Sequence, residues 1–227
     1  MMNGLSKLYK EWRFFILLLL LMSVFRSAVA DWYTVPTGSM KPTILEGDRI
    51  YVNKMAYGLR VPFTTIPVAQ WSSPDRGDVV VFESTAADKR LVKRVIGVAG
   101  DVIQLIDNQL YVNAQQATYT QSQINASSID WGLDTIQPSL MRELLSGSEH
   151  DIALTYRDSY FGPVTVPEGH LFVLGDNRDH SADSRYIGFV PMDEVLGKAL
   201  GVIVSLNPEH YYLPRDGRYL KPLDSDF

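Results

Sequence analysis

Residues 90–112 read RLVKRVIGVAGDVIQLIDNQLYV. Apolar residues gather in three short runs of this stretch, and the turn formers Ala99-Gly100-Asp101 and Asp107-Asn108 separate the runs. Short apolar runs bounded by such turns are typical of β-strands joined by tight connections. The stretch therefore predicts three consecutive strands, at Arg90–Val98, Val102–Ile106 and Gln109–Val112.

The same pattern continues on both sides of this stretch. It predicts further strands at Arg49–Lys54, Asp78–Glu83, Ile152–Tyr156, Val164–Val166, His170–Leu174 and Val195–Ser205. Long amphipathic helices are scarce, and Pro138–Ser146 is the best short candidate. We therefore expect a mainly β fold.

Two segments depart from the strand pattern. Residues 113–148 are rich in Gln, Ser, Asn and Thr, and they predict an insertion or cap beside the sheet. Residues 211–227 are polar and contain two prolines, and they predict a peripheral C-terminal tail. The β core is then expected at residues 34–112 and 149–210.

The composition excludes several classes of protein. The chain has 227 residues, a net charge of −5, four histidines and no cysteine. The acidic excess argues against a nucleic-acid binder, which normally carries a basic face. Without cysteine there is no thiol nucleophile, thiolate zinc site or disulfide. Since the acidic residues between Leu174 and Pro191 do not have EF-hand spacing, we expect neither a metal nor a cofactor.

The N-terminus carries an uncharged apolar run, Phe14–Phe25, after the basic residues Lys7, Lys10 and Arg13. Twelve residues fit the core of a signal peptide, and Ala28-Val29-Ala30 before Asp31 fits the small-x-small cleavage pattern. A cleavable signal is therefore one interpretation of this segment.

A membrane anchor over residues 14–33 is the other interpretation. Roughly 20 residues of helix suffice to cross the hydrocarbon core of a bilayer. Arg26 would then extend its side chain to the headgroups, and Trp32 and Tyr33 would lie at the interface. Both interpretations leave residues 1–13 in the cytoplasm and export the rest of the chain.

Pro36–Thr43, which reads PTGSMKPT, presents a candidate nucleophile. Pro36, Gly38 and Pro42 impose an irregular backbone around the hydroxyl of Ser39. The segment is not the G-x-S-x-G elbow, because Lys41 occupies the position of the second glycine, and Lys41 is also too close for S-x-x-K. Taken alone, the segment is equally compatible with a Ser/Thr-rich turn.

A serine nucleophile needs a base, and lysine competes with histidine for that role. Three histidines, His150, His170 and His210, have the features of surface or satisfied side chains, whereas His180 lies in a charged loop. Lys93 and Arg94 occupy opposite faces of a predicted strand. Only lysine can lose its proton when buried, so Lys93 is the candidate base. The alternative is that Lys93 is an ordinary lysine at an exposed strand edge and has no role in catalysis.

A third segment, Leu174–Pro191, combines three Asp, two Arg and one Asn in a charged loop. Together with the serine and lysine segments it resembles the conserved boxes of bacterial type I signal peptidase, a Ser–Lys protease that removes signal peptides from exported preproteins. The matching stretches are PTGSM-x-PT at 36–43 with Gly47-Asp48, RGDVVVF at 76–82, KRV-x-G-x-x-GD at 93–101, GDNRD at 175–179, SADSR at 181–185 and GFVP at 188–191. They occur in the order of the family.

The resemblance implies a role for each matching residue. Ser39 would be the nucleophile and Lys93 the general base, and the Thr37 hydroxyl would form the oxyanion hole with the Ser39 backbone N–H. Three further residues would support the site: Ser181 by orienting Lys93, and Asp183 and Arg185 as a structural pair. Val35 and Val92 adjoin the two reactive residues and are expected to line the substrate pockets. Lys41 and His180 become bystanders.

The resemblance also implies a signal-peptidase-type coiled, barrel-like β-sheet and favours the anchor over the cleaved signal. The chain would cross the bacterial cytoplasmic membrane once, with its β domain outside. Its partners would be preproteins with small-x-small motifs and membrane lipids, and no nucleic acid; the oligomeric state is not predicted. Ala30–Asp31 would be a possible self-cleavage site.

Three alternatives are compared with this interpretation. The first is a maturation peptidase of the same family that serves one secretion system. The second, a non-catalytic exported β-domain, explains the strands but not the three coincident segments. The third is a self-cleaving repressor, which would need a DNA-binding region where this chain has an apolar one.

Overall fold

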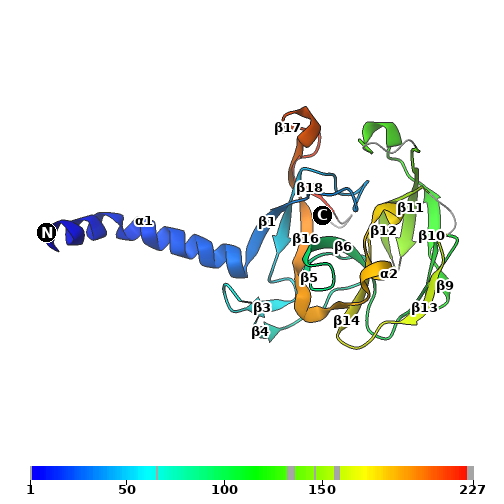
Figure 1. The fold of residues 1–227 in the computed structure, drawn as a ribbon, viewed down its shortest axis with the longest axis horizontal. Helices are drawn as coiled ribbons and strands as arrows, with labels where there is room; N and C mark the ends of the chain where they lie inside the picture. Colours follow the sequence, from blue (N-terminus) through cyan, green and yellow to red (C-terminus); the bar gives the residue numbers. More distant parts are fainter. Residues whose placement is uncertain (1, 65, 132–135, 146, 156–158, 224–227) are drawn as a thin grey trace.

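The computed structural model describes residues 2–64, 66–131, 136–145, 147–155 and 159–223, and for residues 2–11 it describes the helical backbone alone. The fold is mainly β, as predicted. A long N-terminal helix, α1 (Met2–Ala28), extends away from a body in which two β lobes lie side by side (Figure 1).

The first lobe is built on one antiparallel sheet with the strand order β1-β2-β16-β5-β6-β14-β15. Its strands are β1 (Ala30–Thr34), β2 (Asp48–Asn53), β5 (Val79–Ser84), β6 (Lys89–Gly97), β14 (His170–Leu174), β15 (Val190–Pro191) and β16 (Val195–Asn207), with β17 (Leu213–Pro214) and β18 (Lys221–Pro222) pairing with β16. A separate hairpin is formed by β3 (Gly58–Arg60) and β4 (Pro67–Gln70). The alternation of buried and exposed side chains fixes the register of β2: Ile50 and Val52 are fully buried, and Arg49 and Tyr51 are exposed.

The second lobe consists of two smaller sheets. One has the order β13-β7-β8-β9, with β7 (Val102–Ile106), β8 (Gln109–Val112), β9 (Gln115–Gln116) and β13 (Phe161–Thr165). The other has the order β10-β11-β12, with β10 (Thr118–Gln121), β11 (Ser139–Leu145) and β12 (Ser148–Leu154). Short helices complete the described chain: α2 (Ser184–Ile187) and the 3-10 turns η1 (Ala126–Ser128), η2 (Arg178–His180), η3 (Met192–Glu194) and η4 (Pro208–His210).

Strands β6 and β14 belong to the cores of both lobes. Val95 of β6 packs in a cluster with Val80 and Phe82 of the first lobe, whereas Ile96 packs with Ile103 and other residues of the second. Successive side chains of a strand point to opposite faces, so these strands form the boundary between the lobes. Lys93 and Arg94 therefore face opposite sides of this boundary.

One predicted secondary-structure element is wrong. Pro138–Ser146 was expected to be a helix, but its described residues contain β11, in which Glu143 and Leu145 are buried by pairing with β12. The tail was expected to be peripheral; its described residues are mostly exposed, and its short strands β17 and β18 pair with β16. Ser146, Tyr156 and residues 224–227 lie outside the described residues.

The predicted segment 14–33 does not form one continuous helix. Helix α1 ends at Ala28, and Trp32 and Tyr33 belong to strand β1, which pairs with β2. Arg26 does not extend away from the body, because its guanidinium binds Asp31 at 2.6 Å and lies 4.1 Å from the centroid of the Trp32 ring. The expectation of a helix that continues through Tyr33 is therefore wrong, because the helix ends five residues earlier, at Ala28.

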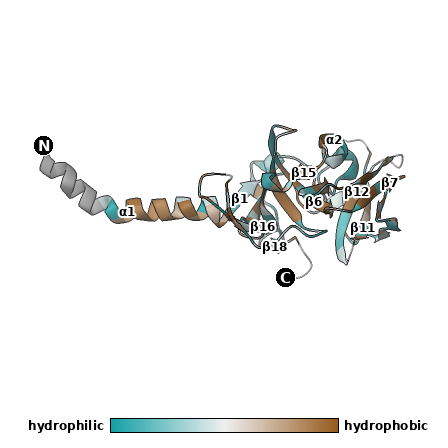
Figure 2. Cartoon of the chain, turned by 90° about the horizontal axis from the view of Figure 1, so that it is seen from below, coloured by the Kyte–Doolittle hydropathy of each residue, from teal (hydrophilic) through white to brown (hydrophobic). Residues whose placement is uncertain are grey.

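The apolar side chains of α1 have few neighbours in the structure. Those of residues 14–22 are exposed, and the helix is coloured as largely hydrophobic along this part (Figure 2). Within the described part of the chain, no helix has both the length and the apolar character required to cross a membrane.

The small-x-small segment lies where the helix joins the sheet. Ala28 and Ala30 are 7% and 5% exposed, and Ala30 pairs with Asn53 of β2. A peptidase needs its substrate in an extended and accessible form, so the folded chain does not present this segment for cleavage.

Candidate active site

Ser39 lies on an irregular loop between β1 and β2, here called the Ser39 loop (residues 35–47). Backbone hydrogen bonds close the loop at its base, from Val35 N to Asp48 O at 2.9 Å and from Gly47 N to Val35 O at 2.8 Å. Met40 and Ile44 are buried in the core of the first lobe. The loop is thus held at its ends and by two apolar side chains, which leaves Ser39 partly exposed.

The side chain of Lys93 reaches Ser39 from strand β6. Its Nζ lies 2.6 Å from the Ser39 Oγ and 3.0 Å from the carbonyl oxygen of Val92. Both are within hydrogen-bonding distance. Lys93 is 1% exposed, so this amine is almost completely removed from water.

Burial alters the protonation of Lys93. It lowers the pKa of the Lys93 ammonium from 10.5 to about 8, because a charged amine is poorly solvated in the protein interior. The carboxylates of Asp183 and Asp176 oppose this change, whereas the positive charge of Lys89 adds to it. A substantial fraction of Lys93 is therefore neutral slightly above neutral pH, in contact with a hydroxyl.

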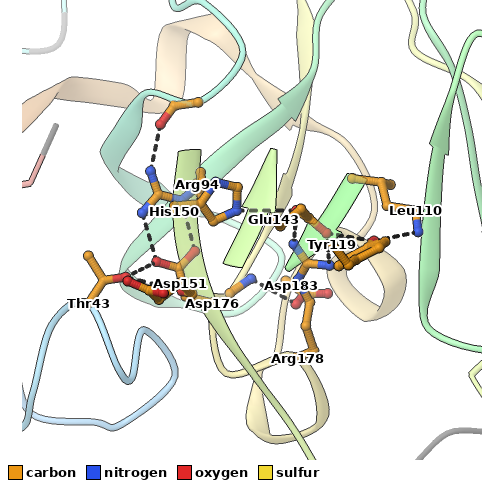
Figure 3. Close-up of polar contacts among 12 residues, drawn as sticks. Thr43, Arg94, Leu110, Tyr119, Glu143, His150, Asp151, Asp176, Arg178 and Asp183 are labelled. Carbon is orange, nitrogen blue, oxygen red and sulfur yellow. Dashed lines mark hydrogen bonds and ion pairs between the residues drawn. The ribbon is translucent and has the colours of Figure 1, made fainter. Parts of the chain in front are cut away.

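Arg94, the next residue of β6, is used differently. Its guanidinium binds both carboxylate oxygens of Asp176, at 2.9 and 2.8 Å, and donates to the Gly77 carbonyl at 2.8 Å (Figure 3). Burial alone would raise the pKa of Asp176, but the Arg94 charge holds it below its ordinary value. The arginine on this strand therefore forms a buried ion pair, while the lysine remains free to titrate.

The segment that follows β14 holds the Ser39 loop from the second-lobe side. Asn177 donates from its backbone N to the Ser39 carbonyl and from Nδ2 to the Gly38 carbonyl, both at 3.1 Å. Thr43 Oγ1 donates to Asp176 Oδ2 at 2.5 Å (Figure 3). Gly175 permits this approach, because a Cβ at this position would overlap the Ser39 carbonyl oxygen.

Two donors near Ser39 are available to a ligand. The Ser39 backbone N–H and the Thr37 hydroxyl have no hydrogen-bond partner among the residues that the structure describes, and Thr37 is exposed. The predicted pocket residues are less accessible. Val35 is 3% exposed and Val92 is partly buried, and both pack in the core of the first lobe.

The predicted pair of Asp183 and Arg185 is present. Arg185 Nε and Nη2 each lie 2.8 Å from the Asp183 carboxylate, which also accepts from the Gly175 N at 3.0 Å and caps α2. The predicted hydrogen bond of Ser181 to Lys93 is not formed. Ser181 Oγ is buried without a hydrogen-bond partner in the described part of the chain, and it lies against Gly175.

A second buried charge cluster lies in the second lobe. Glu143 of β11 binds Arg178 through both carboxylate oxygens, and it also contacts His150 Nε2 at 3.2 Å and accepts from Tyr119 Oη at 2.7 Å (Figure 3). Burial lowers the pKa of His150, with a contribution from the positive charge of Arg94. His150 is therefore a neutral buried side chain in a structural cluster.

Sequence reasoning missed several residues that hold the Ser39 loop. Asn177 belongs to a recognised segment, but the sequence gives no sign that it reaches Ser39. Arg218 of the tail was not considered, although it donates to Asp48 Oδ2 at 2.5 Å and to the Thr43 carbonyl at 3.2 Å. The sequence shows an acidic residue at position 48 but not its burial; in the structure Asp48 is completely buried and so requires a cation.

Comparisons with known proteins identify the family. Residues 9–204 match the family model described as signal peptidase, peptidase S26. Signal peptidase I of Pseudomonas fluorescens is 36% identical over 220 residues, covering 90% of this chain and 75% of that protein. Signal peptidase I of Rickettsia typhi is 37% identical over 210 residues, covering 84% and 78%. The crystal structure of a signal peptidase I from Enterococcus faecalis V583 has 32% sequence identity, a TM-score of 0.35 and coverage of 56% of this chain and 97% of that one.

These matches span most of the chain, which therefore belongs to peptidase family S26. Within that family it is a serine peptidase of the kind that removes signal peptides. The non-catalytic β-domain considered from the sequence is accordingly set aside.

Proposed function

We propose that this chain is a membrane-anchored endopeptidase that uses a Ser39–Lys93 dyad to cleave exported preproteins after small-x-small motifs. One observation carries the proposal: the buried amine of Lys93 lies 2.6 Å from the hydroxyl of Ser39. A nucleophile within hydrogen-bonding distance of a base is the geometry required for covalent catalysis.

The chemistry follows from the protonation of Lys93. A neutral amine accepts the Ser39 proton as Oγ attacks the carbonyl carbon of the scissile bond. The same proton then passes to the leaving nitrogen, the mature protein departs, and an acyl-enzyme ester remains on Ser39. Lys93, neutral again, next takes a proton from water as that water attacks the ester, and it then gives this proton to the departing Ser39 Oγ, which releases the signal peptide and restores the free enzyme.

The remaining site residues support these steps. The Ser39 N–H and the Thr37 hydroxyl would stabilise the tetrahedral oxyanion, a contribution of about 3 kcal/mol for a donor of this kind. The bidentate Asp183–Arg185 pair would fix the segment that contacts the Ser39 loop, and Ser181, which forms no hydrogen bond to Lys93, would pack against Gly175 of that segment. Val92, which is only partly buried, would border a shallow pocket for a small side chain, whereas Val35, at 3% exposure, would not.

We further propose a coiled, barrel-like signal-peptidase fold attached to the bacterial cytoplasmic membrane by α1. The exposed apolar side chains of residues 14–22 support this proposal, because such a surface is unfavourable in water. The basic residues before them would stay in the cytoplasm, and the β domain would face the opposite side. Membrane lipids and signal-peptide-bearing preproteins would be its partners.

The test is cleavage of several unrelated preproteins by the full chain in lipid vesicles. Ser39→Ala and Lys93→Met should each abolish cleavage without loss of folding, whereas Lys54→Met, a matched change at a lysine that contacts Arg26, Ser27 and Asp31, should leave cleavage intact. Sequencing of the products should locate cleavage after small-x-small motifs. Continued cleavage by Lys93→Met would refute the dyad, and cleavage of a single preprotein would favour the dedicated maturation peptidase.

A further inference from the structure

Lys41, two residues after Ser39, is buried. The family resemblance of the sequence implied no role for this residue. Its side chain is 7% exposed, which is rare for a lysine without a firm partner. The Ser39 loop therefore contains a buried cation that the proposed chemistry does not use.

The stem of Lys41 supports the backbone just before Ser39. A Cβ built on Gly38 would lie 2.8 Å from Lys41 Cε and 3.0 Å from Cδ, so these methylenes pack directly against the Gly38 main chain. The Gly38 carbonyl accepts hydrogen bonds from Asn177 Nδ2 at 3.1 Å and from the Lys41 backbone N at 3.0 Å. Gly38 thus contacts both the lysine stem and the Asn177 amide.

The ammonium of Lys41 connects this loop to the second lobe. Nζ donates to the carbonyl oxygen of Asp130 at 2.6 Å, across 89 residues of sequence. Asp130 lies between η1 and β11, in the segment that was predicted to be an insertion or cap. A charge-assisted hydrogen bond of this kind is shorter and stronger than a neutral one.

The other contact of Lys41 is weaker. Glu46 Oε2 lies 3.6 Å from Nζ, and the Glu46 side chain is 44% exposed, so solvent screens this ion pair. The main anchor of the ammonium is therefore the Asp130 carbonyl in the second lobe.

We infer that Lys41 is a positioning residue that holds the Ser39 nucleophile in register with Lys93 by fixing the Ser39 loop to the cap. This inference rests on the proposed function and adds to it a purpose for the inserted segment. It predicts an effect on kcat, since an error of about 1 Å in the position of a nucleophile can reduce rates about 100-fold. The charged groups that shift the pKa of Lys93 are Asp183, Asp176 and Lys89, so a change at Lys41 should leave the pH midpoint in place.

Two substitutions separate the stem from the ammonium. Lys41→Ala removes both contacts, whereas Lys41→Met keeps methylene packing under Gly38 and removes only the hydrogen bond to Asp130. Lys54→Met is the matched control, because Lys54 is also mostly buried and also donates to a backbone carbonyl, that of Arg26 at 2.9 Å.

The measurement is kcat and KM of the full chain in vesicles, expressed per active site titrated with an acylating reagent. We expect Lys41→Ala to lower kcat about 30-fold and Lys41→Met about fivefold, with KM within about twofold and an unchanged pH midpoint. Lys54→Met should stay within about twofold of the wild-type kcat.

Three results would overturn the inference: wild-type kcat per site in both Lys41 variants, a loss explained entirely by fewer titratable sites, or a loss confined to KM. The failure of the proposed function is recognised separately. If Ser39→Ala still cleaves preproteins, the dyad itself is wrong, whatever the Lys41 variants do.

Discussion

The protonation of Lys93 makes the pH dependence of cleavage a quantitative prediction. Its pKa is lowered to about 8 by burial, and only the neutral amine can accept the Ser39 proton. About half of the enzyme is then active at pH 8, about one tenth at pH 7 and about one hundredth at pH 6. A lysine with the ordinary value of 10.5 would be only about 0.3% neutral at pH 8.

The assay is kcat/KM from pH 6 to 10 at constant ionic strength, with a peptide substrate that has blocked termini and no group titrating in this range. We expect a rise of about tenfold per pH unit that levels off above about pH 8. Lys89→Gln provides a second perturbation. Removing that positive charge favours the protonated form of Lys93, so the midpoint should move to higher pH. A midpoint near 10.5, or a profile that is flat between pH 6 and 9, would show that a buried Lys93 with a lowered pKa is not the base.

Three further predictions concern packing and processing. Gly175→Ala forces a Cβ against the Ser39 carbonyl and should lower kcat about 100-fold; wild-type kinetics would show that the loop tolerates displacement. Glu143→Gln leaves the Arg178 cation buried without its counter-charge, which should lower the free energy of unfolding by about 3–5 kcal/mol. The calorimetric Tm should then fall by roughly 10 °C, and an unchanged Tm would contradict this. N-terminal sequencing of the purified full chain should find no product that begins at Asp31, because Ala30 is buried in β1. A major product that begins there would contradict the fold at the junction of α1 and β1.

The strands were predictable from the sequence because their signal is local. Val102–Ile106, Gln109–Val112 and His170–Leu174 have the predicted bounds, and in each case turn residues mark the ends of an apolar run. Strand β11 was not predictable in the same way. Its sequence, SLMRELL, has strong helix formers, and its conformation depends on pairing with β12 and on a buried Glu143 whose partner, Arg178, lies 35 residues away.

The candidate site shows the same division between local and distant information. Side-chain chemistry selects Lys93 over Arg94, and both are placed as that argument requires. The contacts of the Ser39 loop with Asn177 and Asp130 depend on how the two lobes pack, which no spacing in the sequence reports. The contact of Arg26 is different, because it is local: the sequence suggested that Arg26 extends to headgroups, but its guanidinium binds Asp31, five residues further along the chain.

In the proposed mechanism, Ser39 becomes acylated because Lys93 removes its proton. The most direct test is rapid-quench mass spectrometry of the full chain mixed with an acylating peptide ester at pH 8. We predict a transient acyl mass on the tryptic peptide that contains Ser39, its absence in Ser39→Ala, and formation at least about 100-fold slower in Lys93→Met. Acylation of a different residue, or acylation of Ser39 at the normal rate in Lys93→Met, would contradict it.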